Sequence, residues 1–226
     1  RMEWLEQSRL TVVVGYSGSG KTEFSVNLAL ALAAEGEQVM LADLDIVNPY
    51  FRSRERRPLL EKAGVRVISS SQACSDADVP ALPAELLTIL ENREIRGILD
   101  IGGDPVGARV LARFQPKIVQ EDYQLIFVLN SNPPEVRDAE SAAAYLRSIE
   151  AVTGLTCSGL VNNTHLCGET TPAEIRKGAA LAQEVSRQTG IPILCHTAER
   201  RFLESLSDLG EPVFPIAINM KKPWER

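Results

Sequence analysis

Eight consecutive residues near the start of the chain combine glycines with a lysine and a hydroxyl side chain. Residues 15–22 read GYSGSGKT and fit the pattern G-x-x-x-x-G-K-[ST]. They follow an apolar run typical of a strand and open a stretch of helical period, which is the context this pattern requires. The glycines let backbone N–H groups turn inward around phosphate oxygens, and the helix start adds its positive dipole end. Lys21 can reach the β- and γ-phosphates and the Thr22 hydroxyl can ligate Mg²⁺, which predicts a phosphate-binding loop.

Two acidic segments follow later apolar runs. Asp43 and Asp45 flank one leucine, and alternation along a strand puts both carboxylates on one side. One of them can hold a water of the Mg²⁺ shell while the other orients the water that attacks the γ-phosphate. Residues 100–104 read DIGGD, in which Asp100 ends an apolar strand, as an aspartate beside Mg²⁺ does. Gly103 lets its N–H approach a γ-phosphate because no side chain intervenes, so we expect residues 100–109 to act as a switch.

A late segment bears on which base is bound. GTP-binding proteins often place N-K-x-D after a late strand, where the Asp accepts two donors of guanine. Residues 160–165 read LVNNTH and contain no acid. An Asn such as Asn163 can both donate to and accept from adenine. The residues therefore favour ATP over GTP, although Asn163 is also a common turn residue.

Regular elements must position these segments. We predict strands at 10–14, 39–43, 65–69, 97–101, 125–130, 159–162 and 191–195, and helices at 21–35, 53–63, 83–92, 107–114, 134–151, 172–189 and 198–208. This alternation predicts a three-layer α/β fold with a mainly parallel sheet of about seven strands and one domain over residues 1–226. Ligands of such sheets bind beyond the carboxyl ends of the strands, where the polar segments fall.

Composition excludes several classes of function. The formal charge is −6 and the pI is about 5.1, which disfavours a broad nucleic-acid-binding face. No run approaches the ~18 apolar residues of a membrane span. The final segment, residues 219–226, is too short to form a basic amphipathic membrane helix. We therefore expect a cytoplasmic protein. The four cysteines form no C-x-x-C pair, which favours reduced thiols, while a cluster bridging two subunits through Cys74 or Cys167 stays a minor alternative.

Taken together, these segments resemble the MinD/ParA/nitrogenase-iron-protein group of P-loop ATPases, the CobQ/CobB/MinD/ParA nucleotide-binding domains. Residues 43–45 resemble the switch I Asp-x-Asp of MinD-like proteins, residues 100–104 the switch II segment of iron proteins, and residues 159–163 the strand that delivers their adenine-contacting Asn. The resemblance implies a nucleotide-sandwich dimer that changes shape between ATP and ADP. It also implies that Asp45 positions the attacking water.

One position departs from the group. Its phosphate loop carries an extra lysine just after the first glycine, which reaches the partner's phosphates across the dimer, and here that position is Tyr16. One hypothesis is that another cation substitutes. Arg52, Arg54 and Arg109 are candidates because they follow the two switch segments.

These observations lead to a set of candidate site residues. The candidate catalytic residues are Lys21, Asp45 and Asp104, and the candidate Mg²⁺ ligands are Thr22, Asp43, Asp45 and Asp100. The candidate nucleotide contacts are Gly15, Ser17, Gly18, Ser19, Gly20, Lys21, Thr22, Glu23, Gly103 and Asn163.

The leading hypothesis is a slow, Mg²⁺-dependent switch ATPase that acts on a protein partner, in maturation or activation of a metalloenzyme. One alternative is a small-molecule kinase, because the phosphate loop is similar to that of adenylylsulfate kinases. Another is a GTPase similar to the nickel-insertion metallochaperones of hydrogenase and urease. The last is disfavoured because the chain has only two histidines.

Overall fold

The computed structural model describes residues 2–45, 53–69, 84–132, 138–164 and 170–217. Its strands are β1 (Leu10–Gly15), β2 (Val39–Leu44), β3 (Arg66–Ser69), β4 (Arg96–Ile101), β5 (Tyr123–Leu129), β6 (Cys157–Asn162), β7 (Ile193–Glu199) and β8 (Val213–Ile216). Its α-helices are α1 (Lys21–Ala34), α2 (Ser53–Lys62), α3 (Ala84–Glu91), α4 (Pro105–Ile118), α5 (Ala139–Thr153) and α6 (Pro172–Thr189). Short 3₁₀ helices lie at η1 (Glu3–Leu5), η3 (Arg200–Phe202) and η4 (Glu204–Leu206).

The strands form one parallel sheet in the order β3-β2-β4-β1-β5-β6-β7-β8. β1 lies inside the sheet, between β4 and β5. Because all strands run the same way, their carboxyl ends share one edge, where ligands of open α/β sheets bind. The phosphate loop after β1, the acidic segment after β2 and the switch segment after β4 therefore meet there.

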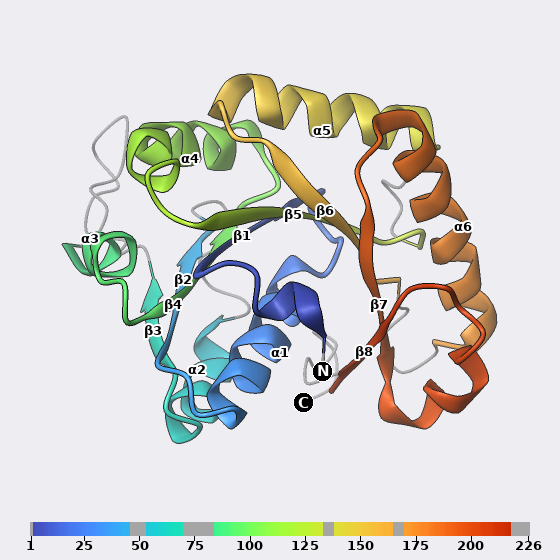
Figure 1. The fold of residues 1–226 in the computed structure, drawn as a ribbon, viewed down its shortest axis with the longest axis horizontal. Coiled ribbons are helices and arrows are strands. Elements are labelled where there is room, and N and C mark those ends of the chain that lie inside the picture. The colour runs from blue at the N-terminus through green and yellow to red at the C-terminus, as the bar shows by residue number, and fades with distance from the viewer. Residues whose placement is uncertain (1, 46–52, 70–83, 133–137, 165–169, 218–226) are drawn as a thin grey trace.

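Helices cover both faces of the sheet, and this explains why every residue of β1 and β2 is buried. On one face α3, α4 and α5 pack through Leu86, Leu111 and Leu146. On the other face α1 and α2 pack through Phe24 and Leu60. Figure 1 shows the two helical layers with the sheet between them. The predicted three-layer α/β fold is confirmed.

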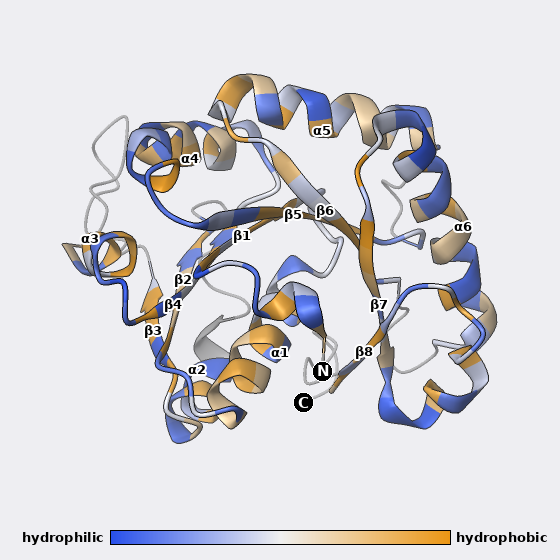
Figure 2. Ribbon diagram, viewed as in Figure 1, coloured by the Kyte–Doolittle hydropathy of each residue, from blue (hydrophilic) through white to orange (hydrophobic). Residues whose placement is uncertain are grey.

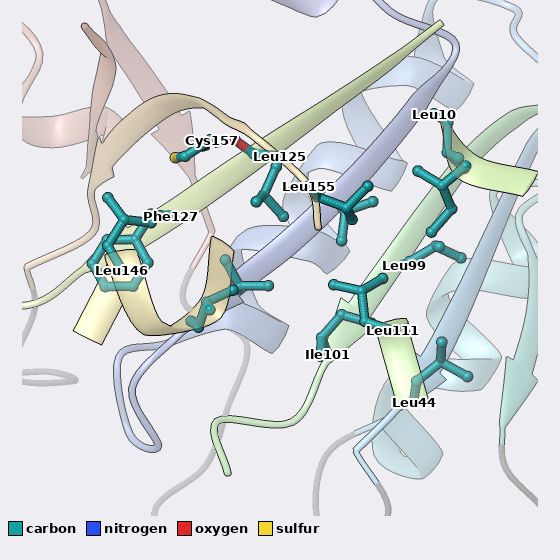
Figure 3. Close-up of a cluster of buried hydrophobic side chains, with 14 of the residues drawn as sticks. Leu10, Leu44, Leu99, Ile101, Leu111, Leu125, Phe127, Leu146, Leu155 and Cys157 are labelled. Atoms are coloured by element: carbon teal, nitrogen blue, oxygen red, sulfur yellow. Dashed lines mark hydrogen bonds between the residues drawn. The ribbon is translucent and has the colours of Figure 1, made fainter. Parts of the chain in front are cut away.

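The apolar core lies along the central strands. Figure 2 shows apolar residues running along β5 and β7, with polar residues on the outer side of α6. In Figure 3, Phe127 of β5 lies beside Leu146 of α5, and Leu99 and Ile101 of β4 face Leu111 of α4. Each of these five side chains is at most 1% exposed. The core thus fixes β4 and β5 on either side of the strand that carries the phosphate loop.

Most helix ends follow the expected capping chemistry. The Asp138 side chain accepts a hydrogen bond of 2.8 Å from Ser141 N, and Thr171 caps α6 immediately before a proline. Gly154 and Gly190 end α5 and α6 in the left-handed conformation, at φ of 69° and 74°. α5 begins at Ala139 and not at residue 134, because the cap is at Asp138; residues 133–137 lie outside the described part of the chain.

The predictions at the carboxyl end were partly wrong. The expected helix over 198–208 is absent: Ala198 and Glu199 continue β7 and pair with Pro215 and Ile216 of β8, and two 3₁₀ turns follow. Over the described residues the sheet therefore has eight strands, one more than expected. β8 was missed because it is short and contains Pro215, which is tolerated there because β8 is an edge strand. Among the described residues, no helix is long and apolar enough to cross a membrane.

Candidate nucleotide-binding site

The phosphate loop makes a tight turn between β1 and α1. Gly18 and Gly20 have φ of 81° and 83°, values that side chains rarely allow, so glycine is needed at both positions. Lys21 Nζ donates to the carbonyl oxygen of Tyr16 at 2.8 Å, which folds the lysine back over the loop. Ser17 and Gly18 are exposed, whereas Ser19 is buried. The turn and the start of α1 thus lie where the sequence predicts them, and phosphate binding by their backbone amides stays a prediction.

The Thr22 hydroxyl lies against the acid that ends β4. Thr22 Oγ1 donates to Asp100 Oδ2 at 2.7 Å. Asp43 is paired with Asp100 in the register of β2 and β4, and the backbone N–H of Asp45 donates to Asp43 Oδ1 at 3.1 Å. The structure thus brings Thr22, Asp43 and Asp100 together, with Asp45 bonded to Asp43 through its backbone, and oxygen donors of this kind suit Mg²⁺. In the described part of the chain no group of three or more His, Cys, Asp and Glu is placed to hold an ion by itself.

The pKa of Asp100 is strongly perturbed. Burial raises its pKa from 3.8 to about 7, and the neighbouring Asp43 carboxylate adds to the rise. Lys21 and the hydrogen bond from Thr22 act in the opposite direction. Two carboxylates side by side without a cation resist ionising together. A divalent cation supplies the missing positive charge, which is why this donor set fits Mg²⁺.

The switch segment is pressed against the phosphate loop. A side chain on Gly103 would place its Cβ 2.8 Å from the carbonyl carbon of Tyr16 and 2.9 Å from the oxygen of Gly15. A Cβ on Gly102 would lie 3.1 Å from Asp45 Oδ1. A side chain at residue 103 would clash with the loop backbone, so glycine is needed there for the switch segment to approach the loop this closely.

Asp104, a candidate catalytic residue, has a structural role in this conformation. Its Oδ1 accepts a hydrogen bond of 2.8 Å from the backbone N–H of Gly107 and thereby caps α4. The cap fixes where α4 begins relative to the switch glycines. A catalytic role for Asp104 stays a prediction and would require the side chain to leave the cap.

Asn163, the candidate adenine contact, is hydrogen-bonded to the backbone of the phosphate loop. It is fully buried, and its Nδ2 donates to the carbonyl oxygens of Ser19 at 3.2 Å and Gly20 at 3.1 Å. Its Oδ1 accepts from the hydroxyl of Thr197 at 2.5 Å. Because these partners occupy the amide, an adenine contact by Asn163 stays a prediction that needs an exchange of bonds. Thr197 was missed from the sequence, since nothing in β7 signals its partner.

Glu23 is buried on the first turn of α1, where Asn27 holds it. Asn27 Nδ2 lies 2.9 Å from the Glu23 carbonyl oxygen and 3.3 Å from Glu23 Oε1. The same Asn27 side chain accepts from the N–H of Ala217 at 2.9 Å and donates to the Ala217 carbonyl oxygen at 3.1 Å. The end of β8 is therefore fastened to the helix that carries Lys21 and Thr22. Sequence reasoning missed Asn27, because it resembles any polar residue of α1.

Tyr16, the residue in place of the expected lysine, points into the protein. Its hydroxyl donates to the carbonyl oxygen of Ser141 at 2.9 Å, and its ring stacks on Tyr145 at 4.1 Å with an interplanar angle of 18°. Tyr145 in turn donates to the carbonyl oxygen of Gly103 at 2.9 Å. Burial, with Tyr16 and Asp104 nearby, raises the pKa of Tyr145 to about 12, so the hydroxyl keeps its proton. Sequence reasoning missed Ser141 and Tyr145, which lie more than a hundred residues from the loop.

A further polar segment follows β5. Asn130 is buried and accepts a hydrogen bond from the N–H of Asn132 at 3.0 Å. Among the described residues, Ser131 Oγ and Asn132 Nδ2 are buried without a hydrogen-bond partner, as is Ser19 Oγ in the loop. Buried polar atoms of this kind suit a polar ligand. The rule that placed the other segments after strand ends also applies to residues 130–132, so this segment was predictable.

Several predicted residues cannot be placed in the site. Arg52, Cys74, Cys167 and the side chain of Arg54 lie outside the described residues, and Arg109 is exposed on α4. Cys157 and Cys195, the other two cysteines, are free and buried. Burial raises the pKa of Cys157 to about 12 and that of Cys195 further, so both are thiols.

Solved structures share this fold at low sequence identity. A nucleotide-binding protein of Archaeoglobus fulgidus in complex with ADP is 19% identical with a TM-score of 0.50, over 93% of this chain and 91% of its own. The 54 kDa signal recognition particle protein of Aeropyrum pernix K1 in complex with GDP is 21% identical with a TM-score of 0.51, over 83% of this chain and 41% of its own. Chloroplast FtsY of Physcomitrella patens is 17% identical with a TM-score of 0.52, over 81% of this chain and 56% of its own.

These likenesses concern the fold alone, and the chain spans about half the length of the signal-recognition proteins that it matches. Among curated protein sequences, none matches the chain significantly. Residues 10–212, however, match the CobQ/CobB/MinD/ParA nucleotide binding domain. This match covers most of the chain and includes the phosphate loop and the two acidic segments. The chain therefore belongs to the CobQ/CobB/MinD/ParA nucleotide-binding domain family of P-loop proteins.

Proposed function

We propose that the chain is a Mg²⁺-dependent ATPase that hydrolyses ATP slowly and works as a nucleotide switch on a protein partner. The observation that carries this proposal is the hydrogen bond of 2.7 Å between Thr22 Oγ1 and Asp100 Oδ2. This bond joins the hydroxyl of the phosphate loop to the aspartate that lies in the neighbouring strand, β4. A hydroxyl and an aspartate in these positions together hold Mg²⁺ in P-loop nucleoside triphosphatases.

The residues around this pair divide the chemistry between them. Lys21 and the loop amides would bind the β- and γ-phosphates, and Thr22 with Asp100 and Asp43 would hold Mg²⁺ and its waters. Bound Mg²⁺ neutralises charge on the phosphate oxygens. Asp45 is our candidate for orienting the attacking water, since it directly follows β2, is partly exposed and lies beside Gly102. Gly103 N–H would contact the γ-phosphate.

ATP is proposed as the nucleotide because residues 160–165 lack the acid that accepts guanine donors. Slow turnover and a protein client are proposed because we expect the two switch segments to respond to the γ-phosphate. Maturation or activation of a metalloenzyme is the client process we infer from the family. A nucleotide-dependent homodimer is also proposed, but Tyr16 is turned toward α5, so a contact across the dimer would have to come from another position.

The test measures inorganic phosphate released from ATP and from GTP by the purified chain with Mg²⁺, with and without a small hydroxyl acceptor. Slow release from ATP without an acceptor supports the switch. Transfer that occurs only with an acceptor would instead support a small-molecule kinase, and preference for GTP would overturn the adenine assignment.

Lys21→Ala is the matching variant. Loss of the charged contacts to the phosphates should weaken ATP binding at least about a hundredfold, measured by calorimetric titration. Lys117→Ala is its control, because Lys117 is half-exposed on α4 and paired with Glu91 at 2.6 Å. An unchanged affinity of Lys21→Ala for ATP would refute the proposal that residues 15–22 bind the phosphates.

A further inference from the structure

An aromatic pair joins the phosphate loop to α5. Tyr16 stacks on Tyr145 with ring centroids 4.1 Å apart, and Phe127 of β5 lies 6.3 Å from Tyr16 and 6.0 Å from Tyr145. Stacked and edge-on aromatic contacts of this kind resist sliding because the rings interlock. The loop position after Gly15 is thereby held by packing against the protein's own interior.

Both tyrosine hydroxyls bind backbone oxygens, and together they close a link between three segments. Tyr16 donates to Ser141 at the start of α5, and Tyr145 donates to Gly103 in the switch segment, each at 2.9 Å. The first bond ties the phosphate loop to α5. The second ties α5 to the switch. Both bonds use carbonyl oxygens, and so leave the Gly103 N–H to the nucleotide contact that we propose for it.

The switch backbone has little room to move around this link. Gly103 is packed against the Tyr16 and Gly15 backbone on one side, while its carbonyl oxygen is held by Tyr145. Asp104 directly after it caps α4 through Gly107. A phosphate that draws the Gly103 N–H inward must therefore stretch the bond from Tyr145 or carry Tyr145 with it.

We propose that Tyr145 is a positioning residue that transmits the presence of the γ-phosphate from Gly103 to α5, with Tyr16 as the fixed surface against which it turns. This inference rests on the proposed nucleotide switch, and it identifies the residue through which a change at the nucleotide site reaches α5. α5 packs against both α4 and α6, so a shift of Tyr145 reaches the outer helical layer. Its outer face exposes Arg147 and Val152, where a partner would meet the change.

The test compares Tyr145→Phe with Tyr123→Phe. Both variants lose only a hydroxyl, and Tyr123 is a matched control because its oxygen accepts a hydrogen bond of 3.2 Å from Thr156 N at the opposite end of β5. Hydrogen exchange of α5 amides is measured with ADP and with a non-hydrolysable ATP analogue, and the dissociation constants of both ligands are determined.

In the wild type and in Tyr123→Phe, we expect the analogue to slow exchange in α5 more than ADP does. Tyr145→Phe should lose this difference. Its affinity for ADP should stay within about twofold, while its preference for the analogue over ADP should fall about fivefold, the usual effect of one neutral hydrogen bond.

Two results would overturn the inference separately from the proposed function. If Tyr145→Phe keeps the full α5 response and the full preference for the analogue, the link does not transmit, although the switch proposal stands. If the wild type binds both ligands but α5 does not respond, transmission through α5 is likewise refuted. If the wild type binds neither ligand, the proposed function fails and the inference fails with it.

Discussion

Replacing Asp100 by Asn should stabilise the protein in the absence of ligand. The Asp100 carboxylate is buried beside Asp43, and its pKa rises from 3.8 to about 7. A rise of this size corresponds to ~4 kcal/mol of unfavourable free energy for the charged form in the folded state. Asn keeps an oxygen that can accept from Thr22 but must itself be desolvated. We therefore expect Asp100→Asn to gain ~2 kcal/mol of unfolding free energy at about pH 8.

The gain should depend on pH with a definite sign. Below the unfolded pKa of 3.8 the Asp100 carboxyl is protonated in the folded and the unfolded state, so its burial as a charge does not lower the free energy of unfolding. Between 3.8 and about 7 the folded state retains a proton that the unfolded state releases, so the wild type loses stability as the pH rises. Above about 7 both states are ionised and the cost is constant. The advantage of Asp100→Asn should therefore grow across this range and then level off.

Urea unfolding of both proteins at several pH values measures this difference directly. Asp104→Asn is the control, because the same chemical change at a partly exposed helix cap retains a good capping residue. In the presence of Mg²⁺ and ATP the order should reverse, since only the wild type gains binding free energy through Asp100. Equal stability of Asp100→Asn and wild type at about pH 8, or a difference that does not change with pH, would refute the reasoning.

Two substitutions test the support of the loop and the closeness of the switch. Asn163→Ala removes the amide bonds to the carbonyl oxygens of Ser19 and Gly20 and the acceptor of the buried Thr197 hydroxyl, although Gly20 keeps its bond from Phe24 N. The free energy of unfolding should therefore fall by ~2–4 kcal/mol in urea titrations, against less than ~1 kcal/mol for the partly exposed Asn92→Ala. Equal losses would contradict the supporting role. Gly103→Ala places a methyl group against the loop backbone and should cost ~1–3 kcal/mol and abolish phosphate release, while Gly210→Ala, which meets no atom within 4 Å, should be neutral. A fully active Gly103→Ala would show that the loop and switch do not need this approach.

The loop and the acids could be predicted because their signals are local. The glycine pattern before Lys21 encodes a turn, and Asp43 and Asp100 each end an apolar run, so parallel pairing of those strands suffices to bring them together. The alternation of strands and helices likewise predicts a parallel sheet, whereas the order of its strands comes from the structure alone.

The supporting contacts could not be predicted from such signals. Tyr145 reaches Gly103 and Asn163 reaches Gly20 only because α5 and β6 dock at particular heights on the sheet, which depends on the packing of the whole core. Asp104 shows the same limit from the other side, because a residue in a chemically suggestive segment caps a helix here. Local patterns specify where the backbone turns, whereas tertiary packing decides what a polar side chain meets.

Pro215 bears on how copies of this chain can assemble. It lies in β8, the last strand of the sheet, and has no backbone N–H with which to bind an incoming strand. A proline on an exposed edge is a common protection against pairing between molecules. Extension of the sheet from β8 into a second copy is therefore disfavoured, and the protein is protected there against aggregation by strand addition.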